Sequence, residues 1–247
     1  MRFHPGVHRP APVALCVLLA LAVAVPGAAS AAGARQSGSI RWTSTRPGSA
    51  SGLSIDLRFH NPDGASLKPY SVAKLVVRSP AGARVDTTVP PRCEASDAQL
   101  IAQGFDGCPR STRIGSAVVD GDTGSSGPFP RYTRTHVRNY NGDHEIIGVG
   151  INDDLPAIRS VDHTRIEGST STTSFPIFPG QPPPDPFVAF RRLRIQLDRY
   201  VRGGRSYITT PPTCPRSRRW TITATFTYHD GVSQSLRSRS PCRRRGR

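Results

Sequence analysis

Trp220-Thr221-Ile222-Thr223-Ala224-Thr225-Phe226-Thr227-Tyr228 is the stretch that decides the fold class of this chain. Large or apolar side chains alternate along it with threonines, and a period of two is typical of a β-strand with one buried face. Asp230-Gly231 follows and signals a tight turn, so residues 232–240 should return as an antiparallel partner. The chain is therefore expected to be built from β-hairpins.

The same alternation recurs through most of the chain. Residues 53–59 place four apolar side chains on one face and end at a turn over 61–64. Further short strands are predicted at 74–78, 85–89, 113–119 and 187–197. An antiparallel β-sandwich accommodates such a set of strands, and a jelly-roll is one form of it.

Asn141-Gly142 is the strongest short hairpin signal in the sequence. It lies between the apolar-patterned segments 135–140 and 143–151. A two-residue turn at this point would pair Arg138 with Glu145 and Val137 with Ile146.

One short helix is predicted between Cys93 and Cys108, where the period of two is lost. Residues 95–102 carry apolar side chains at helical spacing, and Gly104 is placed to end the helix. The predicted fold class is all-β, an antiparallel β-sandwich with one short helix inside a disulfide loop.

The first residues have the features of a secretory signal peptide. Arg2 and Arg9 charge the start, residues 13–25 are apolar, and Ala29-Ser30-Ala31 supplies a small-x-small cleavage site. The apolar run is too short to cross a bilayer, and no later segment is as apolar. We therefore expect a signal peptide at 1–31 and a secreted, extracellular or wall-associated protein without a transmembrane segment, with an uncleaved anchor as the alternative.

Residues 32–242 are expected to form a single domain, followed by a basic tail at 243–247. A polar stretch at 169–174 and a proline-rich stretch at 176–186 interrupt the strand pattern. The segment 168–186 is therefore a candidate internal boundary or long loop.

Four cysteines remain after cleavage, because Cys16 leaves with the leader. Four cysteines allow three connectivities. A hairpin turning at 230–231 brings Cys242 opposite residues 218–219, close to Cys214, and so favours Cys214–Cys242 together with Cys93–Cys108. A zinc site built from the same thiols is the alternative, but the spacing lacks a Cys-x-x-Cys pair.

The segments around these cysteines resemble secreted proteins of high-GC Gram-positive bacteria that have no known activity. The resemblance is carried by 90–97 (PPRCEASD), 107–111 (GCPRS) with Ile114-Gly115, 207–215 (YITTPPTCP), Trp220, Tyr228 with Asp230-Gly231, and Ser240-Pro241-Cys242. It implies an exported, disulfide-stapled β protein and brings no cofactor or catalytic residue with it.

A formal net charge of +16 makes the chain strongly basic. Such a field attracts anionic polymers, and outside a cell these are cell-envelope polymers or lipid headgroups. The candidate contacts are the two arginine clusters of the C-terminal part: Arg216, Arg218 and Arg219, and Arg243, Arg244, Arg245 and Arg247. Nucleic acid is not expected, because no aromatic residues interleave with arginines on one strand. A GC-rich coding bias alone would also explain the arginines.

Metal sites have only weak support. His144-Glu145-Ile146-Ile147-Gly148 lacks the second histidine of a zinc-protease helix, and His136 and His144 would point to opposite faces of the hairpin. Asp120-Gly121-Asp122 and Asn152-Asp153-Asp154 offer calcium-type oxygens without the remaining ligands of a known loop. Turn chemistry explains both stretches, so no cofactor or metal is predicted.

Catalysis is also weakly supported, because the chain has no Gly-x-Ser-x-Gly elbow. We therefore expect an exported, non-catalytic protein that binds a ligand or has a structural role at the cell envelope. The alternative is a carbohydrate-active hydrolase or lyase with two carboxylates drawn from Asp143, Glu145, Asp153, Asp154 and Asp162.

Overall fold

The computed structural model describes residues 33–243. The expected leader at 1–31 and the arginines Arg244, Arg245 and Arg247 of the basic tail lie outside these described residues. No helix among residues 33–243 is long and apolar enough to cross a membrane.

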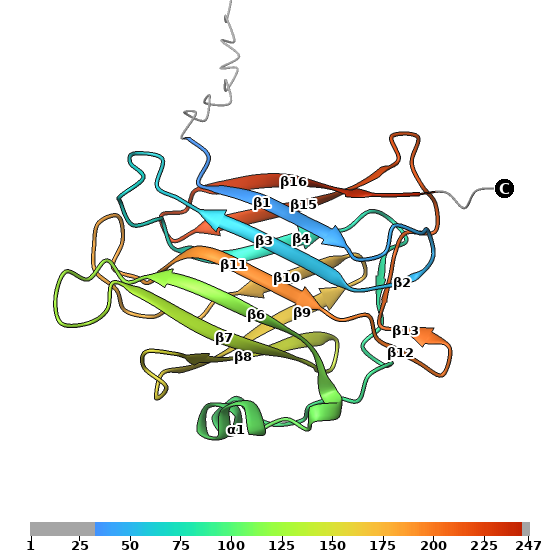
Figure 1. The fold of residues 1–247 in the computed structure, drawn as a ribbon, viewed down its shortest axis with the longest axis horizontal. Coiled ribbons are helices and arrows are strands. Elements are labelled where there is room, and N and C mark those ends of the chain that lie inside the picture. Colours follow the sequence, from blue (N-terminus) through green and yellow to red (C-terminus); the bar gives the residue numbers. More distant parts are fainter. Residues whose placement is uncertain (1–32, 244–247) are drawn as a thin grey trace, which may run out of the picture. The chain divides into compact units, whose positions relative to one another are not determined.

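One large antiparallel sheet dominates the fold (Figure 1). Its strands are hydrogen-bonded in the order β1-β3-β11-β6-β7-β8-β9-β10-β4-β15-β16. Their bounds are β1 (Gln36–Trp42), β3 (Leu53–Phe59), β4 (Val72–Arg78), β6 (Arg113–Asp122), β7 (Tyr132–Asn141), β8 (Glu145–Asn152), β9 (Arg159–Glu167), β10 (Thr170–Ser174), β11 (Ala189–Leu197), β15 (Arg219–Tyr228) and β16 (Ser233–Pro241).

Five short strands form two small accessory sheets. The first has the order β2-β14-β5 and the second pairs β12 with β13. Their bounds are β2 (Ala50–Ser51), β5 (Arg84–Val85), β12 (Val201–Arg202), β13 (Arg205–Ser206) and β14 (Ile208–Thr209).

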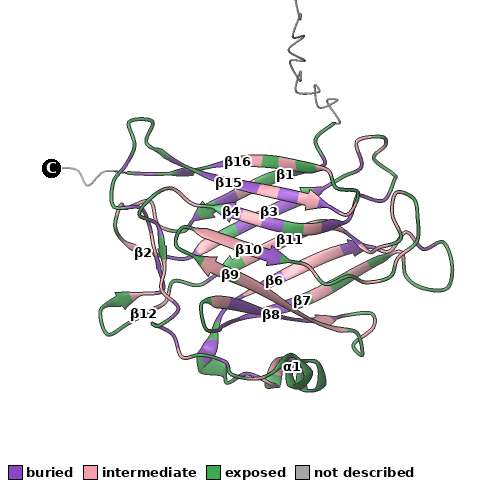
Figure 2. Cartoon of the chain, turned by 180° about the vertical axis from the view of Figure 1, so that it is seen from behind, coloured by how far each residue is buried: buried purple, intermediate pink, exposed green. Residues whose placement is uncertain are grey.

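The large sheet folds over on itself into two facing layers. Strands β1, β3, β11 and β6 lie in one layer, and β15, β4, β10 and β9 lie behind them (Figures 1 and 2). The two edge strands, β1 and β16, therefore come side by side. The expected β-sandwich is present, with its two layers belonging to one continuous sheet.

Serine hydroxyls join the two edge strands. The Ser238 hydroxyl accepts a hydrogen bond from the Ile40 amide and donates one to the Ile40 carbonyl, both at 2.8 Å. The Ser240 hydroxyl accepts one from the Trp42 amide at 3.1 Å. We call this contact between β1 and β16 the seam.

Aromatic side chains from both layers form the main core. The whole apolar face of β15 is buried as its alternation predicts, from Trp220 to Tyr228. Trp220 packs edge-to-face on Trp42 of β1 with ring centroids 5.3 Å apart, and Phe226 packs in the same way on Phe59 of β3 at 5.7 Å. Such pairs stabilise the fold beyond the burial of their area.

The predicted helix is present as α1 (Asp97–Gln103). Ser96 and Gln99 form a capping box at its start, and Gly104, with φ of 61°, ends it. Leu100 packs with the Cys93–Cys108 disulfide and Tyr140 in a second small core on the outer face of the sheet. The structure thus confirms one short helix inside a disulfide loop.

The second disulfide joins Cys214 and Cys242 at the open end of the β15–β16 hairpin. Arg219 pairs with Pro241, and the Cys242 amide donates to the Arg218 carbonyl. The locally favoured connectivity is therefore confirmed, and it takes up all four thiols that a zinc site would need.

The predicted register of the β7–β8 hairpin is wrong. Val137 pairs with Gly150 and Arg138 with Val149, because the turn lies at residues 142–144 instead of 141–142. Asn141 remains in β7, fully buried, and its side-chain amide donates to the carbonyls of residues 87 and 90. The bonds of Asn141 to this neighbouring loop outweigh its turn propensity.

The segment 168–186 does not separate two sheets. Residues 170–174 form β10, which pairs with β9 and β4 inside the large sheet. The proline-rich connection that comes after β10 is held by Lys68, whose buried ammonium donates to the Phe187 carbonyl at 2.6 Å and forms an ion pair with Asp185 at 3.4 Å. The segment is a strand followed by an anchored loop.

Two further differences concern which strands form. Of the strand predicted at 85–89 only Val85 is in a strand, as the last residue of β5, because the Asp86 carboxylate accepts from the Thr88 amide and turns the chain. Strands β1, β9 and β10 were not predicted from the sequence.

Candidate functional site

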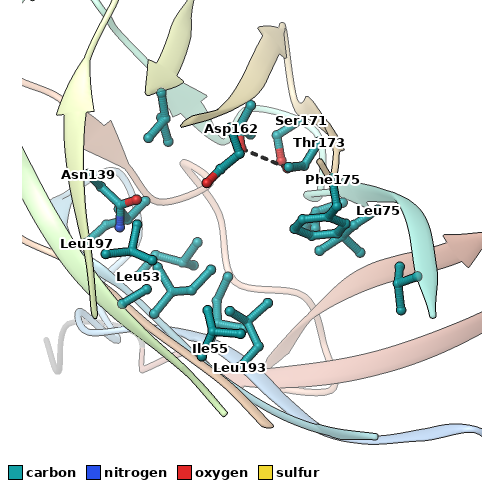
Figure 3. A pocket seen from close by; sticks show the side chains of 18 of the residues that line it. Leu53, Ile55, Leu75, Asn139, Asp162, Ser171, Thr173, Phe175, Leu193 and Leu197 are labelled. Carbon is teal, nitrogen blue, oxygen red and sulfur yellow. Dashed lines mark hydrogen bonds between the residues drawn. The ribbon is translucent and has the colours of Figure 1, made fainter. Parts of the chain in front are cut away.

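A cavity of about 230 Å³ lies between the two layers of the sheet (Figure 3). One wall is apolar and comes from strands β3 and β11. Its side chains include Leu53, Ile55, Leu193 and Leu197. Ligand cavities in proteins are commonly apolar with a few polar groups, so this wall suits the body of a small apolar molecule.

The opposite wall carries many small and hydroxyl side chains on strands β7, β9 and β10, together with Val137 and Ile166. Thr135, Ser160, Thr164, Ser171 and Thr173 all line the cavity there. The hydroxyls of Thr164 and Thr173 bond to each other at 2.7 Å across β9 and β10. Short side chains on this side leave the space that large apolar residues fill elsewhere in the core.

Asp162 of β9 points from this wall into the cavity (Figure 3). It pairs in register with Gly148 of β8, and the carboxylate lies directly over that glycine. A Cβ atom at position 148 would be 2.4 Å from Asp162 Oδ1, closer than any real contact. Glycine at 148 is therefore what allows the carboxylate to occupy this position.

The surroundings of Asp162 disfavour its charged form. Burial raises the pKa of its carboxyl from 3.8 to about 6, and the nearby His163 opposes this only partly. No hydrogen bond to another described residue stabilises the carboxylate. Its accessible surface faces the cavity, so a ligand or solvent there is the available partner.

Asn139 of β7 is a second polar group in the lining. It pairs with Gly148, which in turn pairs with Asp162, so the two polar residues flank one glycine on three neighbouring strands. Asn139 is buried, and its side-chain Nδ2 has no hydrogen-bond partner within the described residues. The cavity thus contains both an unpartnered acceptor and an unpartnered donor.

The cavity reaches the surface at the ends of the strands. Its lining includes Gly168 and Ser169 in the β9–β10 turn and Ile177 in the proline-rich connection, and all three are exposed. A small molecule therefore has routes to the interior that need no rupture of the sheet.

His163, next to Asp162 in β9, lies on the outer face of the sheet. Its Nδ1 is 3.0 Å from Glu145 Oε2 and its Nε2 is 3.0 Å from Asp97 Oδ1 at the start of α1. Burial disfavours the imidazolium, but the bonds to both carboxylates outweigh this and raise the pKa of His163. Arg159 donates to the carbonyls of Ile101 and Ala102 near the other end of α1. Both residues fasten the helix to β9.

The histidines and acidic loops considered as metal ligands do not gather at one site. His136 pairs with Asp153 at 3.0 Å, while His144 lies in the hairpin turn beside Asp143. Asp120 and Asp122 are in strand β6, where the first pairs with Arg134 at 2.7 Å. No group of three or more metal-binding side chains occurs among the described residues.

The five carboxylates considered for hydrolysis do not converge either. Asp143 pairs with Arg92 at 2.8 Å, Glu145 contacts His163 on the outer face, and Asp153 and Asp154 are exposed. Asp162 is the only carboxylate that lines the cavity in the described part of the chain. Paired-carboxylate chemistry thus lacks its second group in the cavity.

The arginine clusters lie at the open end of the β15–β16 hairpin. Arg216, Arg218, Arg219 and Arg243 are all exposed there, brought together by the Cys214–Cys242 disulfide. No ion pair links these four to a carboxylate of residues 33–243.

The sequence alone did not identify the cavity. Ser160, Asp162 and Thr164 alternate with Val161 and His163, so the strand would be oriented with its polar face outward. Gly148 and Gly150, spaced by two in β8, were the available signal, because glycines in a strand often mark a close approach.

No family model, curated protein or solved structure matches this chain.

Proposed function

We propose that this chain is an exported, non-catalytic protein of the cell envelope or exterior that binds a small, mainly apolar molecule between its two layers. The observation that carries the proposal is the cavity of about 230 Å³, with an apolar wall and an isolated carboxylate opposite. A cavity of about 150 Å³ lined by aliphatic and aromatic side chains holds benzene, so this one has room for one ring with a short side chain.

Two disulfides support the export half of the proposal. Cys93–Cys108 and Cys214–Cys242 use all the cysteines of the described chain, and such bonds persist in oxidising compartments. Mass spectrometry of protein recovered from culture fluid should show both bridges and a chain that begins near residue 32.

Titration with indole, a neutral apolar molecule of suitable size, tests ligand binding. We expect wild-type protein to bind it in isothermal calorimetry, and Ala117→Leu to lose binding because Ala117 lines the cavity. Ala98→Leu, on the exposed side of α1, is the matched control and should bind like wild type. Absence of indole binding to wild type, or equal binding by Ala117→Leu, would contradict the proposal.

Attraction to anionic envelope polymers is a second function that the arginine cluster supports. The side chains of Arg216, Arg218, Arg219 and Arg243 are exposed and free of ion pairs within the described chain, so their charge is available. Retention on phosphatidylglycerol vesicles should fall steeply with added salt.

Matched variants distinguish binding by the local arginine cluster from attraction by the overall positive charge of the chain. Removal of residues 243–247, or exchange of Arg216, Arg218 and Arg219 for Gln, should weaken vesicle retention at low salt. Exchange of the exposed Arg58, Arg165 and Arg202 for Gln removes the same charge elsewhere and should weaken it less. Equal retention by both triple variants would leave only the net charge and dispose of a localised site.

A further inference from the structure

Asp162 places a half-buried carboxylate without a cationic partner inside the sheet, in a chain that carries 33 lysines and arginines. Removal of a charge from water is unfavourable unless a counter-charge or hydrogen bonds replace the water. Other interior acids follow this rule: the buried Asp122 pairs with Arg131 at 3.2 Å. Asp162 has neither kind of partner among the described residues.

The elements packed around Asp162 supply no cation. Gly148 of β8 lies beneath Asp162. On the other side of β9, Thr173 of β10 and Phe175, just after that strand, line the cavity. Leucine and isoleucine side chains of β3 and β11 form the wall opposite (Figure 3). His163 is the one charged group that acts on Asp162, and it lies on the outer face, held by Asp97 and Glu145. Arg84 and His229 also line the cavity, but neither of them shifts the pKa of Asp162.

The backbone is built to keep this carboxylate in place. Gly148 gives up its side chain where a Cβ would be 2.4 Å from Asp162 Oδ1, and Gly150 does the same beside Ser160 Oγ, at 2.3 Å. Glycine weakens a strand interior, so two glycines in β8 cost stability on a wall that could have been filled with apolar residues. Functional sites are often less stable than an optimally packed core, so glycines that make room for an unpaired carboxylate indicate a binding group.

We propose that the molecule bound in the cavity is a compact organic amine, whose ammonium group pairs with the Asp162 carboxylate while its ring or branched chain packs on the leucine wall. The inference rests on the proposed ligand-binding function and specifies its ligand class. A carboxylate that has neither an ion pair nor a hydrogen bond to the described residues favours a cationic ligand, because a charge-assisted bond replaces the hydration that the carboxylate loses when a ligand displaces solvent from the cavity.

Three probes of nearly equal size test the ligand class. They are 2-phenylethylamine, 2-phenylethanol and 3-phenylpropionate, titrated at pH 7.5 into wild type, Asp162→Asn and Asp154→Asn. The last variant removes an exposed carboxylate and so matches the change in net charge. Wild type and Asp154→Asn should bind the amine about tenfold or more tightly than the alcohol, and the propionate most weakly, as expected for a charge-assisted bond.

The Asp162→Asn variant should lose that preference for the amine and still bind the alcohol. In wild type, affinity for the amine should also fall as the pH is lowered through 6, since Asp162 then takes up a proton, whereas binding of the alcohol should change little. Asp162→Leu repeats the test if the asparagine variant does not fold.

The outcomes separate the two levels of the proposal. Binding of the alcohol without any preference for the amine, or an equal preference in Asp162→Asn, overturns the amine class and leaves the cavity function standing. Binding of none of the three probes by folded wild type, together with no binding of indole, overturns the cavity function itself.

Discussion

Asp162 shows how a single residue links the stability of this chain to its proposed use. Its carboxyl has a pKa of about 6 in the folded chain against 3.8 when free, so the folded state holds the proton over a range in which the unfolded state has released it. Stability that Asp162 contributes is therefore greatest below pH 4 and is lost as the pH rises toward 6 and above.

Asp162→Asn should remove this pH dependence. A shift of this size corresponds to about 2 to 3 kcal/mol, so the variant should be more stable than wild type by about 2 kcal/mol at pH 7.5 and similar to it at pH 4. Urea denaturation followed by circular dichroism at both pH values measures the difference. A variant less stable than wild type at pH 7.5 would show that the carboxylate has a stabilising partner.

His163 should also stabilise the fold in its protonated form, which for a histidine is the charged form. Its pKa is raised in the folded chain by Asp97 and Glu145, so its stabilisation is present below its unfolded pKa and is lost as the pH rises through the folded value. We expect His163→Gln to cost about 0.5 to 1 kcal/mol at pH 5.5, a small figure because the site is partly solvated, and less at pH 8.5. Comparison in an Asp162→Asn background keeps the two titrations apart, and an equal loss at both pH values would contradict the ion pairs.

The sequence pattern predicted correctly which side chains are buried only where the local alternation of apolar and polar residues decides burial. The alternation in β15 is unopposed, so its buried face was predicted correctly to the last residue. Asp162 has the same local pattern as a solvent-facing acid, because sequence does not reveal that the polar side of β9 is turned inward. Only the closing of the sheet brings that face against the leucine wall.

At the scale of elements, the hairpins depend on what their turns contact. The Asp230 carboxylate forms an ion pair with Arg35 at 2.8 Å and still accepts from the Val232 amide within the turn, and the predicted β15–β16 hairpin is present. Asn141-Gly142 lies against the loop at 87–91, where backbone carbonyls recruit the Asn141 side chain and move the turn along the chain. The same kind of dipeptide signal therefore predicted the turn correctly at 230–231 and not at 141–142.

The two disulfides should differ in effect because they close loops of different length. Their sequence separations are 15 for Cys93–Cys108 and 28 for Cys214–Cys242, which correspond to about 3 and 3.6 kcal/mol in the chain-entropy model. Replacement of both cysteines of a pair by Ser should lower the free energy of unfolding by these amounts, measured in guanidinium chloride.

Limited proteolysis provides a second measure of what the Cys93–Cys108 bridge stabilises. Loss of Cys93–Cys108 should expose α1 to proteolysis while β15 and β16 stay protected, because α1 packs in a separate small core. Equal protection of α1 with and without its bridge would show that His163 and Arg159 hold the helix by themselves.

At the scale of the whole molecule, the order of strands determines where the cavity lies. Strands far apart in sequence, such as β3 and β10, face each other because the sheet folds over (Figure 1). The sequence predicted the all-β class and most strands of the apolar layer. It did not predict the polar wall, since β9 and β10 gain their buried face only from this long-range arrangement.

Closure of the sheet should depend on two hydroxyl groups. Ser238→Ala removes both bonds to Ile40 and leaves a buried amide and carbonyl unpaired, so we expect a loss of about 1 to 3 kcal/mol in thermal or urea unfolding. Ser235→Ala, on the exposed face of the same strand, is the matched control and should cost less than about 0.5 kcal/mol. Equal losses in the two variants would show that the seam contributes nothing beyond packing.

The seam also has a dynamic consequence. Between β1 and β16 the backbone is bridged by side chains alone, so these strands can part there while each keeps its full ladder to β3 or β15. The amide protons of Ile40 and Trp42 should therefore exchange with deuterium sooner than those in the middle of β11 or β4. Transient separation of β1 from β16 would widen the circumference of the folded sheet while every strand ladder stays intact.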